Sequence, residues 1–262
     1  MFRYLKLMKK ILMLSLQQDM EFRPNFIAAV FSSLLWILVP IILFKAIYGH
    51  VDSIAGWAWE DIIILLGTYV IIDSVMMGLL INNMGELQDD IIEGKLDTYL
   101  TKPIDSQFYA SFRRIDFPQL TNTISGVFIV MYGYYSASFS FHFINLLLYI
   151  LFLLTGMITY YSIWFIWTAT SFWWPSNEHR DSLFLNNIII ARFPIDIFNG
   201  GFGFIFKMMV PLALIANPAA MALIGNVGWE LGIISVFISI FFLILSRIIW
   251  QLGLKSYSST GS

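Results

Sequence analysis

The sequence contains no cysteine, and charged residues make up only 12% of its 262 residues. A chain without cysteine has no disulfide framework and no thiolate metal site. His50, His142 and His179 are its only histidines, and no two of them have the spacing of metal ligands. The net charge of −2 and the lack of a long basic run give no indication of nucleic-acid binding. We therefore expect neither a metal site nor a nucleic-acid partner.

The sequence also lacks the short motifs that mark catalytic and nucleotide-binding sites. It contains no Gly-x-x-x-x-Gly-Lys-Ser/Thr loop, no His-Glu-x-x-His and no Gly-x-Ser-x-Gly. Without the first of these, the chain has no phosphate-cradling loop of its own. We expect a non-catalytic protein that binds no cofactor, so that any use of ATP requires a separate subunit.

Hydrophobic residues, by contrast, make up 58% of the chain, and aromatic residues make up 17%. A soluble domain carries about a quarter of charged residues, roughly twice the proportion in this chain. Runs of about 20 apolar residues are long enough to cross a membrane as α-helices. The composition therefore predicts an all-α integral membrane protein.

We expect one transmembrane domain over residues 1–262 with six spans, at about residues 26–48, 61–81, 117–139, 143–172, 201–216 and 229–250. The fifth span is the least regular, because it contains Lys207 and Pro211 and ends at Asn217-Pro218. Such a sequence indicates a break in the helix or a re-entrant turn before Trp229.

The first 22 residues combine a basic and an apolar face. On a helix, Arg3, Lys6 and Lys10 share one side, and a second side carries Leu5, Met8, Leu12 and Leu16. This pattern is typical of an amphipathic helix lying in the membrane surface, and a frayed tail is the alternative. The apolar run at residues 11–16 is too short for a cleavable signal peptide.

Lysine and arginine predict the orientation of the six spans. With six spans, both termini lie on one side of the membrane, together with the loops at residues 82–116 and 175–200. Fourteen of the fifteen lysines and arginines then lie at or near that side, and only Lys45 lies toward the other. Because cytoplasmic loops carry the excess of these residues, we expect both termini in the cytoplasm.

One long charged segment, Gly85–Pro103, lies between the second and third spans, and we call it the acidic segment. Four of its acidic residues would form one stripe on a continuous helix, being spaced by four, three and four: Glu86, Asp90, Glu93 and Asp97. An apolar stripe would lie beside it, formed by Ile92, Leu96, Tyr99 and Leu100. Gly94 could end one short helix before another begins, and Pro103 closes the segment. Such a two-faced element is a candidate for docking a cytoplasmic partner; the alternative is a solvated loop.

Apart from Asp61 at its first position, Asp73 is the single charged residue of the second span. A carboxylate inside the bilayer is costly, so it is a functional hypothesis by default. A role in transport or ion coupling, an interhelical hydrogen bond and a position beside an aqueous cavity all remain open. A secondary transporter usually carries several such groups, whereas this span carries one.

The acidic segment resembles the loop after the second span of ABC-2 type transporter permeases, in the run Ile92-Glu-Gly-Lys-Leu-Asp-Thr-Tyr-Leu-Thr-Lys-Pro103. Three later motifs also resemble the family, in the same order: Arg192-Phe193-Pro194, Pro211 with Asn217-Pro218-Ala219, and Trp250-x-x-Gly253-Leu254-Lys255-x-Tyr257. The chain departs from the family where Ala216-Asn217 stands in place of a tyrosine pair. The similarity covers nearly the whole length.

The resemblance implies the membrane subunit of an ATP-driven exporter in a prokaryotic cell membrane, with ATP and Mg²⁺ bound by partner ATPase subunits. It also implies a second permease, identical or homologous, with spans 1, 2 and 5 reorienting across the interface between the two. A cytoplasmic coupling helix would follow span 2, formed by Glu86, Asp90, Ile92, Glu93, Gly94, Lys95, Leu96, Asp97, Leu100 and Pro103. Separately from the resemblance, the many aromatic residues along the third and fourth spans would suit a lipid or an amphipathic drug as substrate, and helix packing is the alternative.

A second interpretation comes from a different class of protein. An ion-gradient-driven secondary transporter or channel would use Asp73 as its proton- or cation-binding group. An ATP-driven exporter does not need Asp73 for coupling, whereas the secondary transporter does. A membrane enzyme is a third class, for which the sequence offers no catalytic constellation.

Overall fold

The computed structural model describes residues 2–174, 180–198 and 211–257. Within these ranges the chain forms helices and no β-strand, which confirms the expected all-α class. The α-helices are α1 (Phe2–Glu21), α2 (Arg23–Tyr48), α3 (Trp59–Ile92), α4 (Asp97–Leu100), α5 (Ser106–Phe112), α6 (Phe117–Ser136), α7 (Phe143–Ala169), α8 (Arg180–Ile188), α10 (Asn217–Ile224) and α11 (Trp229–Ser256). Short 3₁₀ helices are η1 (Thr170–Phe172), η2 (Ile189–Arg192), η3 (Ile195–Ile197) and η5 (Leu212–Leu214).

Four of the described helices are long and apolar enough to cross a membrane: α2, α3, α7 continued through η1, and α11. Helix α6 has 20 residues and packs along α3. Most of the expected fifth span, residues 201–210, lies outside the described residues. The multi-pass character is therefore confirmed, while the number of six spans stays a prediction.

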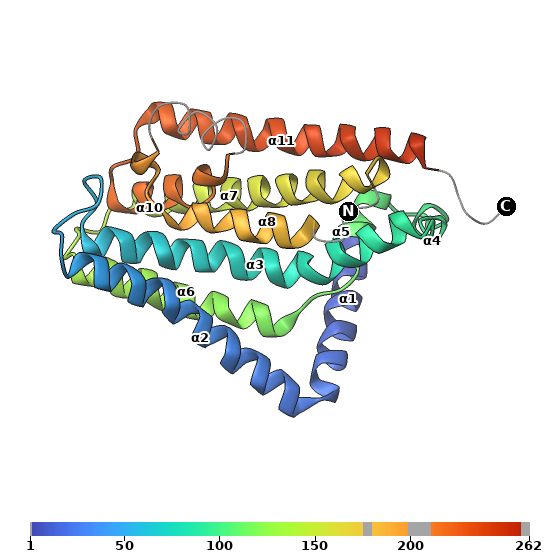
Figure 1. Ribbon diagram of the computed structural model, residues 1–262, viewed down its shortest axis with the longest axis horizontal. Coiled ribbons are helices and arrows are strands. Elements are labelled where there is room, and N and C mark those ends of the chain that lie inside the picture. The colour runs from blue at the N-terminus through green and yellow to red at the C-terminus, as the bar shows by residue number, and fades with distance from the viewer. Residues whose placement is uncertain (1, 175–179, 199–210, 258–262) are drawn as a thin grey trace.

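Helix α3 forms the centre of the bundle, with α6 and α2 on one side and α7 and α8 on the other (Figure 1). Glycines allow α3 and α6 to approach each other closely. A Cβ atom on Gly67 would lie 2.7 Å from the amide nitrogen of Val130, and one on Gly126 would lie 2.9 Å from that of Ile71. Because any side chain at these two positions would clash with backbone, the glycines fix the distance between the helices.

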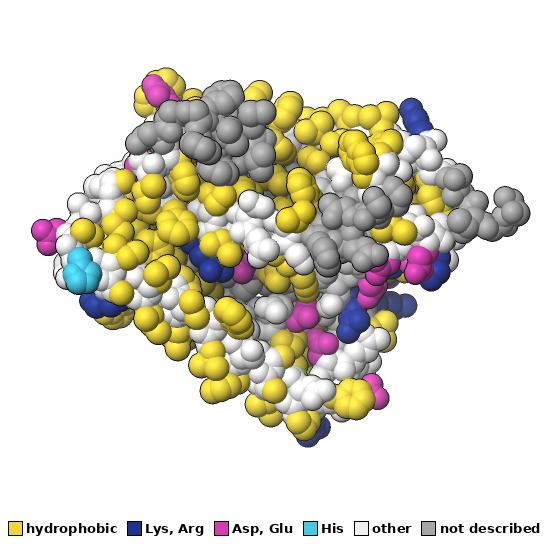
Figure 2. Space-filling view, viewed as in Figure 1, with side chains coloured by type: hydrophobic (Ala, Val, Ile, Leu, Met, Phe, Trp, Pro, Cys, Tyr) yellow, Lys and Arg dark blue, Asp and Glu magenta, His cyan; other side chains and the backbone are white. Residues whose placement is uncertain are grey.

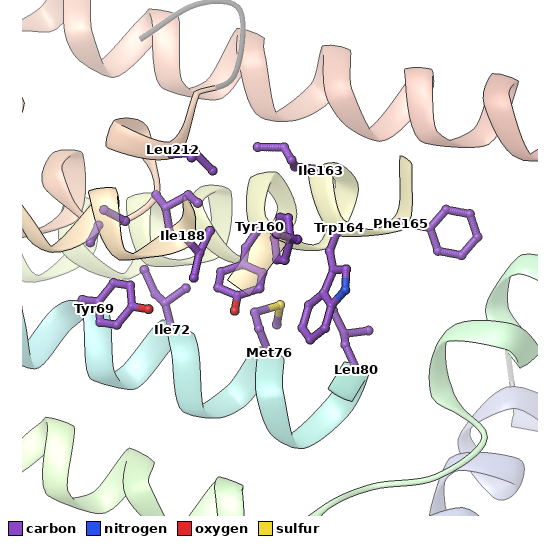
Figure 3. Close-up of a cluster of buried hydrophobic side chains, with 14 of the residues drawn as sticks. Tyr69, Ile72, Met76, Leu80, Tyr160, Ile163, Trp164, Phe165, Ile188 and Leu212 are labelled. Atoms are coloured by element: carbon purple, nitrogen blue, oxygen red, sulfur yellow. The ribbon is translucent and has the colours of Figure 1, made fainter. Parts of the chain in front are cut away.

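The opposite side of α3 packs against an aromatic layer from α7 (Figure 3). Tyr160 and Trp164 are fully buried there beside Met76 and Leu80 of α3. The ring of Trp164 stacks on Phe184 of α8, with a centroid distance of 5.1 Å. These contacts hold α3, α7 and α8 together as one core.

The segment after Pro211 is short, broken and buried. Asn217 opens α10, and its side chain bonds three backbone groups: Oδ1 accepts from the amide of Ile195 at 2.8 Å, and Nδ2 donates to the carbonyls of Phe193 and Ala213 at 3.0 Å. A buried asparagine satisfied in this way fixes irregular backbone in place. At the expected break near Asn217, the hydrogen bonds of this side chain connect the residues of η3, η5 and α10.

The two ends of the bundle differ in what they carry (Figure 1). One end holds the first turn of α1, the short helices α4 and α5, and the last turn of α11. The other end holds the loop between α2 and α3, together with α10 and the start of α11. Helix α1 runs across the direction of the long helices, as an interfacial helix beside membrane spans would.

Candidate functional site

The acidic segment is a helix end, a tight turn and a four-residue helix. Helix α3 ends at Ile92, and Gly94 adopts the left-handed conformation with φ of 72°. The amide of Lys95 donates to the carbonyl of Asp90 at 2.8 Å, and that of Gly94 donates to Ile91 at 3.4 Å. These two bonds form a Schellman motif, which requires a residue such as glycine at the left-handed position. The predicted helix break at Gly94 is confirmed.

The same turn shows that one continuous acidic stripe was the wrong expectation. Glu86 and Asp90 stay on α3, while Asp97 begins α4 after the chain has changed direction at Gly94. The four acidic side chains therefore separate into an inner pair and an outer pair.

The inner pair, Glu86 and Asp90, is held by Arg113. One guanidinium nitrogen lies 2.8 Å from Glu86 Oε2, and another lies 3.0 Å from Asp90 Oδ2. The Tyr99 hydroxyl also donates to Asp90, and the Arg113 guanidinium lies 5.0 Å from the centroid of the Tyr99 ring. The Arg113 side chain is only 16% exposed and connects α3, α4 and the residues after α5, whereas its partner Glu86 is 49% exposed.

The outer pair, Glu93 and Asp97, lies at the protein surface. Glu93 forms an ion pair with Lys95 across the turn. Both partners of that pair are more than half exposed, so solvent screens their attraction. The outer pair is therefore open to a partner protein, and so is Glu86 of the inner pair, which is 49% exposed.

The apolar stripe also divides into buried and exposed residues. Leu96 is 0% exposed and Tyr99 is 1% exposed, because both pack into the core of this chain. Ile92 and Leu100 are 40% and 46% exposed. Leu96 is thus buried, as expected, but within this chain, and Ile92 and Leu100 are the apolar side chains of the stripe that are open to a partner.

Helix α5, directly after the acidic segment, is bonded to the last helix. Asp105 caps α5 by accepting from the amide of Phe108 at 2.9 Å. Arg247 of α11 grips the same carboxylate with two bonds of 2.5 and 3.1 Å, and it also donates to Gln107 Oε1 at 3.1 Å. A bidentate arginine–carboxylate pair fixes orientation as well as distance.

Further bonds join this region to α7 and α11. Gln107 Nε2 donates to the Tyr161 hydroxyl at 3.1 Å, and Trp250 Nε1 donates to Ser106 Oγ at 3.0 Å. The amide of Leu96 donates to the hydroxyl of Tyr257 at 3.0 Å. A displacement of α4 and α5 would therefore act directly on α7 and α11.

Helix α1 and the last third of α3 also bond to the residues around α5. Buried Asn83 of α3 donates to the carbonyls of Ser111 and Arg114 at 3.0 and 2.7 Å. Ser15 and Asp19 of α1 accept from the backbone amides of Ile115 and Phe117, each at 3.0 Å. Helix α1 thus contacts the residues that join α5 to α6.

Asp105 and Tyr99 are among the groups of this region with shifted pKa values. Burial alone would raise the pKa of Asp105, but the bonds from Arg247 and from the Phe108 amide outweigh it and hold the pKa below its ordinary value. Burial and the hydrogen bond to Asp90 raise the pKa of Tyr99. Both groups therefore keep their native charge states, a carboxylate and a neutral phenol, at neutral pH.

Asp73 lies in a second polar cluster near the middle of α3. The hydroxyls of Tyr69 and Tyr160 both donate to Asp73 Oδ1, each at 3.1 Å. Arg192 of η2 lies with its guanidinium 4.6 Å from the centroid of the Tyr69 ring and interacts electrostatically with Asp73. A cavity of about 200 Å³ between α2, α3 and α6 is lined by Asp73 and Arg192. The structure thus combines the interhelical hydrogen bond and the cavity that the sequence left as alternatives.

Residues that matter to this arrangement were missed in the sequence. Arg113 and Arg114 directly follow α5, so a cationic partner for the acidic segment could have been sought there. Arg247 is the only basic residue of the last predicted span, which is a signal of a specific partner. Tyr257 and Asn83 carried no comparable signal.

The described residues contain no group of three or more His, Cys, Asp or Glu side chains that could hold a metal ion. The acidic residues of the acidic segment are instead paired with arginine, lysine or tyrosine, or exposed. These paired side chains hold neighbouring helices together.

Comparison with known protein families gives a match over most of the chain. The model of a family described as ABC-2 family transporter protein matches residues 34–261, which includes the acidic segment, α5, Arg192 and α11. No curated protein and no solved structure matches the chain.

Proposed function

Because the chain belongs to the ABC-2 family of transporter proteins, we propose that it is the permease subunit of an ATP-driven exporter. Permeases of this family are membrane components of ABC transport and work with ABC ATPase subunits. The sequence has no nucleotide-binding loop, so ATP and Mg²⁺ bind to the partner ATPase. The permease itself carries out no chemical step.

The observation that carries this proposal is the exposed outer part of the acidic segment. Glu93, Asp97, Ile92 and Leu100 offer two carboxylates and two apolar side chains at one end of the bundle. A complementary surface would carry basic groups around an apolar pocket. We assign these four residues to contact with the ATPase, and the ion pairs of Arg113 to holding them in position.

The contacts suggest how ATP binding would move the permease. Closure of two ATPase subunits displaces α4, and α5 moves with it. Arg247 and Trp250 pass that displacement to α11, and Asn83 passes it to α3. Spans 1, 2 and 5 would then reorient across an interface with a second permease, identical or homologous, to release a lipid or amphipathic substrate.

We place the acidic segment and both termini in the cytoplasm of a prokaryotic cell. The chain has no cysteine, so introduced cysteines report topology individually. Ser53→Cys and Asn226→Cys, both exposed at the end opposite to α4, should react with an impermeant thiol reagent in intact cells. Thr98→Cys should react only after the cells are opened, and labelling of Thr98→Cys in intact cells would overturn the orientation.

Co-expression with an ABC ATPase subunit from the same organism tests the proposal. The two proteins should co-purify, and extrusion of an amphipathic dye should require ATP hydrolysis. An ATPase variant that binds ATP but does not hydrolyse it is the matched control and should abolish extrusion. Extrusion that persists with this variant but stops when the ion gradient is collapsed would contradict the proposal.

The second candidate is the ion-gradient-driven transporter, favoured by the buried Asp73 cluster. In that case Asp73→Asn should abolish transport, because the ion-binding group is lost. The same substitution in an ATP-driven exporter should leave transport dependent on ATP hydrolysis, whatever its effect on substrate binding. Measuring ATPase activity and transport on the same preparation separates the two functions.

A further inference from the structure

The cavity between α2, α3 and α6 brings opposite charges together at membrane depth. Asp73 lies 14 residues after the first residue of α3 and 19 before the last, close to the middle of the helix. Figure 2 shows the surface hollowed between α2 and α3. Because a polar group at this depth is costly, a cavity with an acid and a base on its wall requires a physical reason.

Neither charged group is saturated by the hydrogen bonds within the described part of the chain. A carboxylate has about four lone-pair sites, and the hydroxyls of Tyr69 and Tyr160 use two of them, both on Oδ1 of Asp73. Arg192 Nε is buried and has no hydrogen-bond partner among the described residues. Both groups therefore retain capacity for a ligand.

The wall of the cavity that α6 forms is polar but uncharged. Gln119 and Asn122 of α6 line it with their amide groups. Ser33 of α2 donates to Asn122 Oδ1 at 3.0 Å, which orients that amide. Amide nitrogens supply donors to anionic oxygens, so these groups add to the donor capacity of Arg192.

We propose that this cavity binds the head group of a zwitterionic amphiphile, with the anionic part on Arg192 and the α6 amides and the cationic part on Asp73. A head group of one charge would pair with one side chain and leave the other buried charge without its compensating partner, which is costly. An uncharged head group would offer neither charge a partner. Only a head group that carries both a positive and a negative charge can pair with Asp73 and Arg192 at the same time.

The size of the cavity sets what part of the ligand enters. Pockets for whole drug-sized ligands measure roughly 300–1,000 Å³, and this cavity measures about 200 Å³. It therefore holds a head group and leaves the apolar tail outside. Trp36 of α2 lines the cavity and is 71% exposed, so the tail would lie along the apolar outer face of α2.

Because the cavity lies deep along α3, a head group would occupy it only while the substrate crosses the membrane. A lipid at rest keeps its head group at the membrane surface, whereas a head group in this cavity lies near the middle of α3. The inference rests on the proposed exporter function and names its substrate class as zwitterionic amphiphiles. Asp73 then acts in substrate binding, and ion coupling is not its role.

Four amphiphiles with the same twelve-carbon tail test the site: dodecylphosphocholine, dodecyl phosphate, dodecyltrimethylammonium and dodecyl maltoside. Binding to the full-length permease is measured in nanodiscs of anionic lipid, with empty discs as background and each amphiphile below its micellar concentration. We expect dodecylphosphocholine to bind at least tenfold more tightly than the other three. Equal affinity for all four would overturn the proposal.

Single substitutions identify which wall binds which charge. Asp73→Asn should weaken the binding of dodecylphosphocholine at least fivefold, while dodecyl phosphate binds unchanged or more tightly. Arg192→Gln should also weaken the binding of dodecylphosphocholine, but here dodecyltrimethylammonium should bind unchanged or more tightly. Gln119→Leu leaves the charged pair in place and should weaken dodecylphosphocholine by a smaller factor. Asp52→Asn and Arg23→Gln remove exposed charges outside the cavity and serve as matched controls.

Unchanged dodecylphosphocholine affinity in both Asp73→Asn and Gln119→Leu would contradict the site. The binding assay needs neither ATP nor the ATPase, so its failure leaves the exporter function to be decided by co-purification. Loss of co-purification with intact head-group selectivity would, in turn, contradict the exporter and leave the binding site in place.

Discussion

Helices α2 and α3 are both long and apolar enough to cross a membrane, yet their surroundings are opposite. In the most apolar stretch of α3, 78% of the residues are buried inside the chain, against 6% in that of α2. Large side chains of α2 face outward, among them Ile27, Phe31, Trp36 and Ile42. Composition thus identifies a membrane helix without identifying what covers its outer face.

The difference has a cause in the small residues of the two helices. Helix α3 contains Gly67 and Gly78 on its side toward α6, where a Cβ atom would clash with Val130 and Leu120. Helix α2 contains no glycine along Arg23–Tyr48 and carries Pro40 instead. Close helix packing in membranes depends on small residues, so α3 packs as the central frame and α2 lies at the edge.

The largest expected effect is a loss of stability when a large side chain is introduced into the buried helix α3. Gly67→Leu inserts a side chain against the backbone of Val130, and overpacking of this kind costs roughly 1–3 kcal/mol or more. Ala29→Leu adds similar bulk to the exposed face of α2 and should leave the unfolding temperature unchanged. Thermal unfolding in detergent, followed by tryptophan fluorescence, measures both. Equal destabilisation by the two substitutions would remove the distinction between frame and edge.

The same contrast exists within the acidic segment, between Leu96 and Leu100. Leu96→Asp places a charge in the core and should destabilise the permease itself, by about 2 kcal/mol or more. Leu100→Asp lies at the surface and should leave the fold intact while weakening association with the ATPase. Unfolding temperature and co-purification, measured on both variants, separate the two effects. A stable Leu96→Asp variant would contradict the burial of that residue.

A smaller effect is expected where α5 meets α11. Arg247→Gln removes the bidentate bond to Asp105, so α5 would move without carrying α11 along. We expect the complex with the ATPase to form normally and transport to fall several-fold. Lys255→Gln, a change near the end of the same helix, is the control. Normal transport in Arg247→Gln would show that α11 does not receive the motion.

The smallest effect concerns the pH dependence of the same pair. The pKa of Asp105 is lower in the folded state than its ordinary value of about 3.9, so the pair stabilises the fold fully above that pH. Its contribution is lost as the pH falls through the lower folded pKa. Because both side chains are more than a third exposed, the contribution is about 1 kcal/mol or less. Asp105→Asn keeps the helix cap and should flatten the fall in unfolding temperature below pH 4.

Local signals in the sequence predicted local structure correctly, and long-range contacts were beyond them. The helix break at Gly94 and the irregular chain near Asn217 follow from the backbone preferences of glycine and proline. The stripe of four acidic residues was wrong because a periodic pattern assumes a continuous helix, which Gly94 interrupts. What Leu96 packs against could not be read from its apolar character, since a pattern marks an apolar face without naming what covers it.

The candidate sites show the same division. The acidic segment was recognised from its density of charge, yet its inner ion pairs depend on Arg113, which reaches back to Glu86 and Asp90 from beyond α5. Asp73 was recognised as a lone intramembrane charge, but its neighbour Arg192 follows 119 positions later. Only the folded chain brings such residues together, because no local preference specifies their pairing.

Reversing the outer pair of the acidic segment tests the central claim most directly. Glu93→Lys combined with Asp97→Lys changes only surface side chains, so the permease should fold and insert normally. Like charges facing each other across a docking surface cost several kcal/mol, so the ATPase should no longer co-purify and transport should stop. Asp52→Lys with Glu230→Lys, two exposed charges at the opposite end, is the matched control and should retain the complex. A double reversal that still binds the ATPase and transports normally would contradict the account, leaving the acidic segment as a solvated loop.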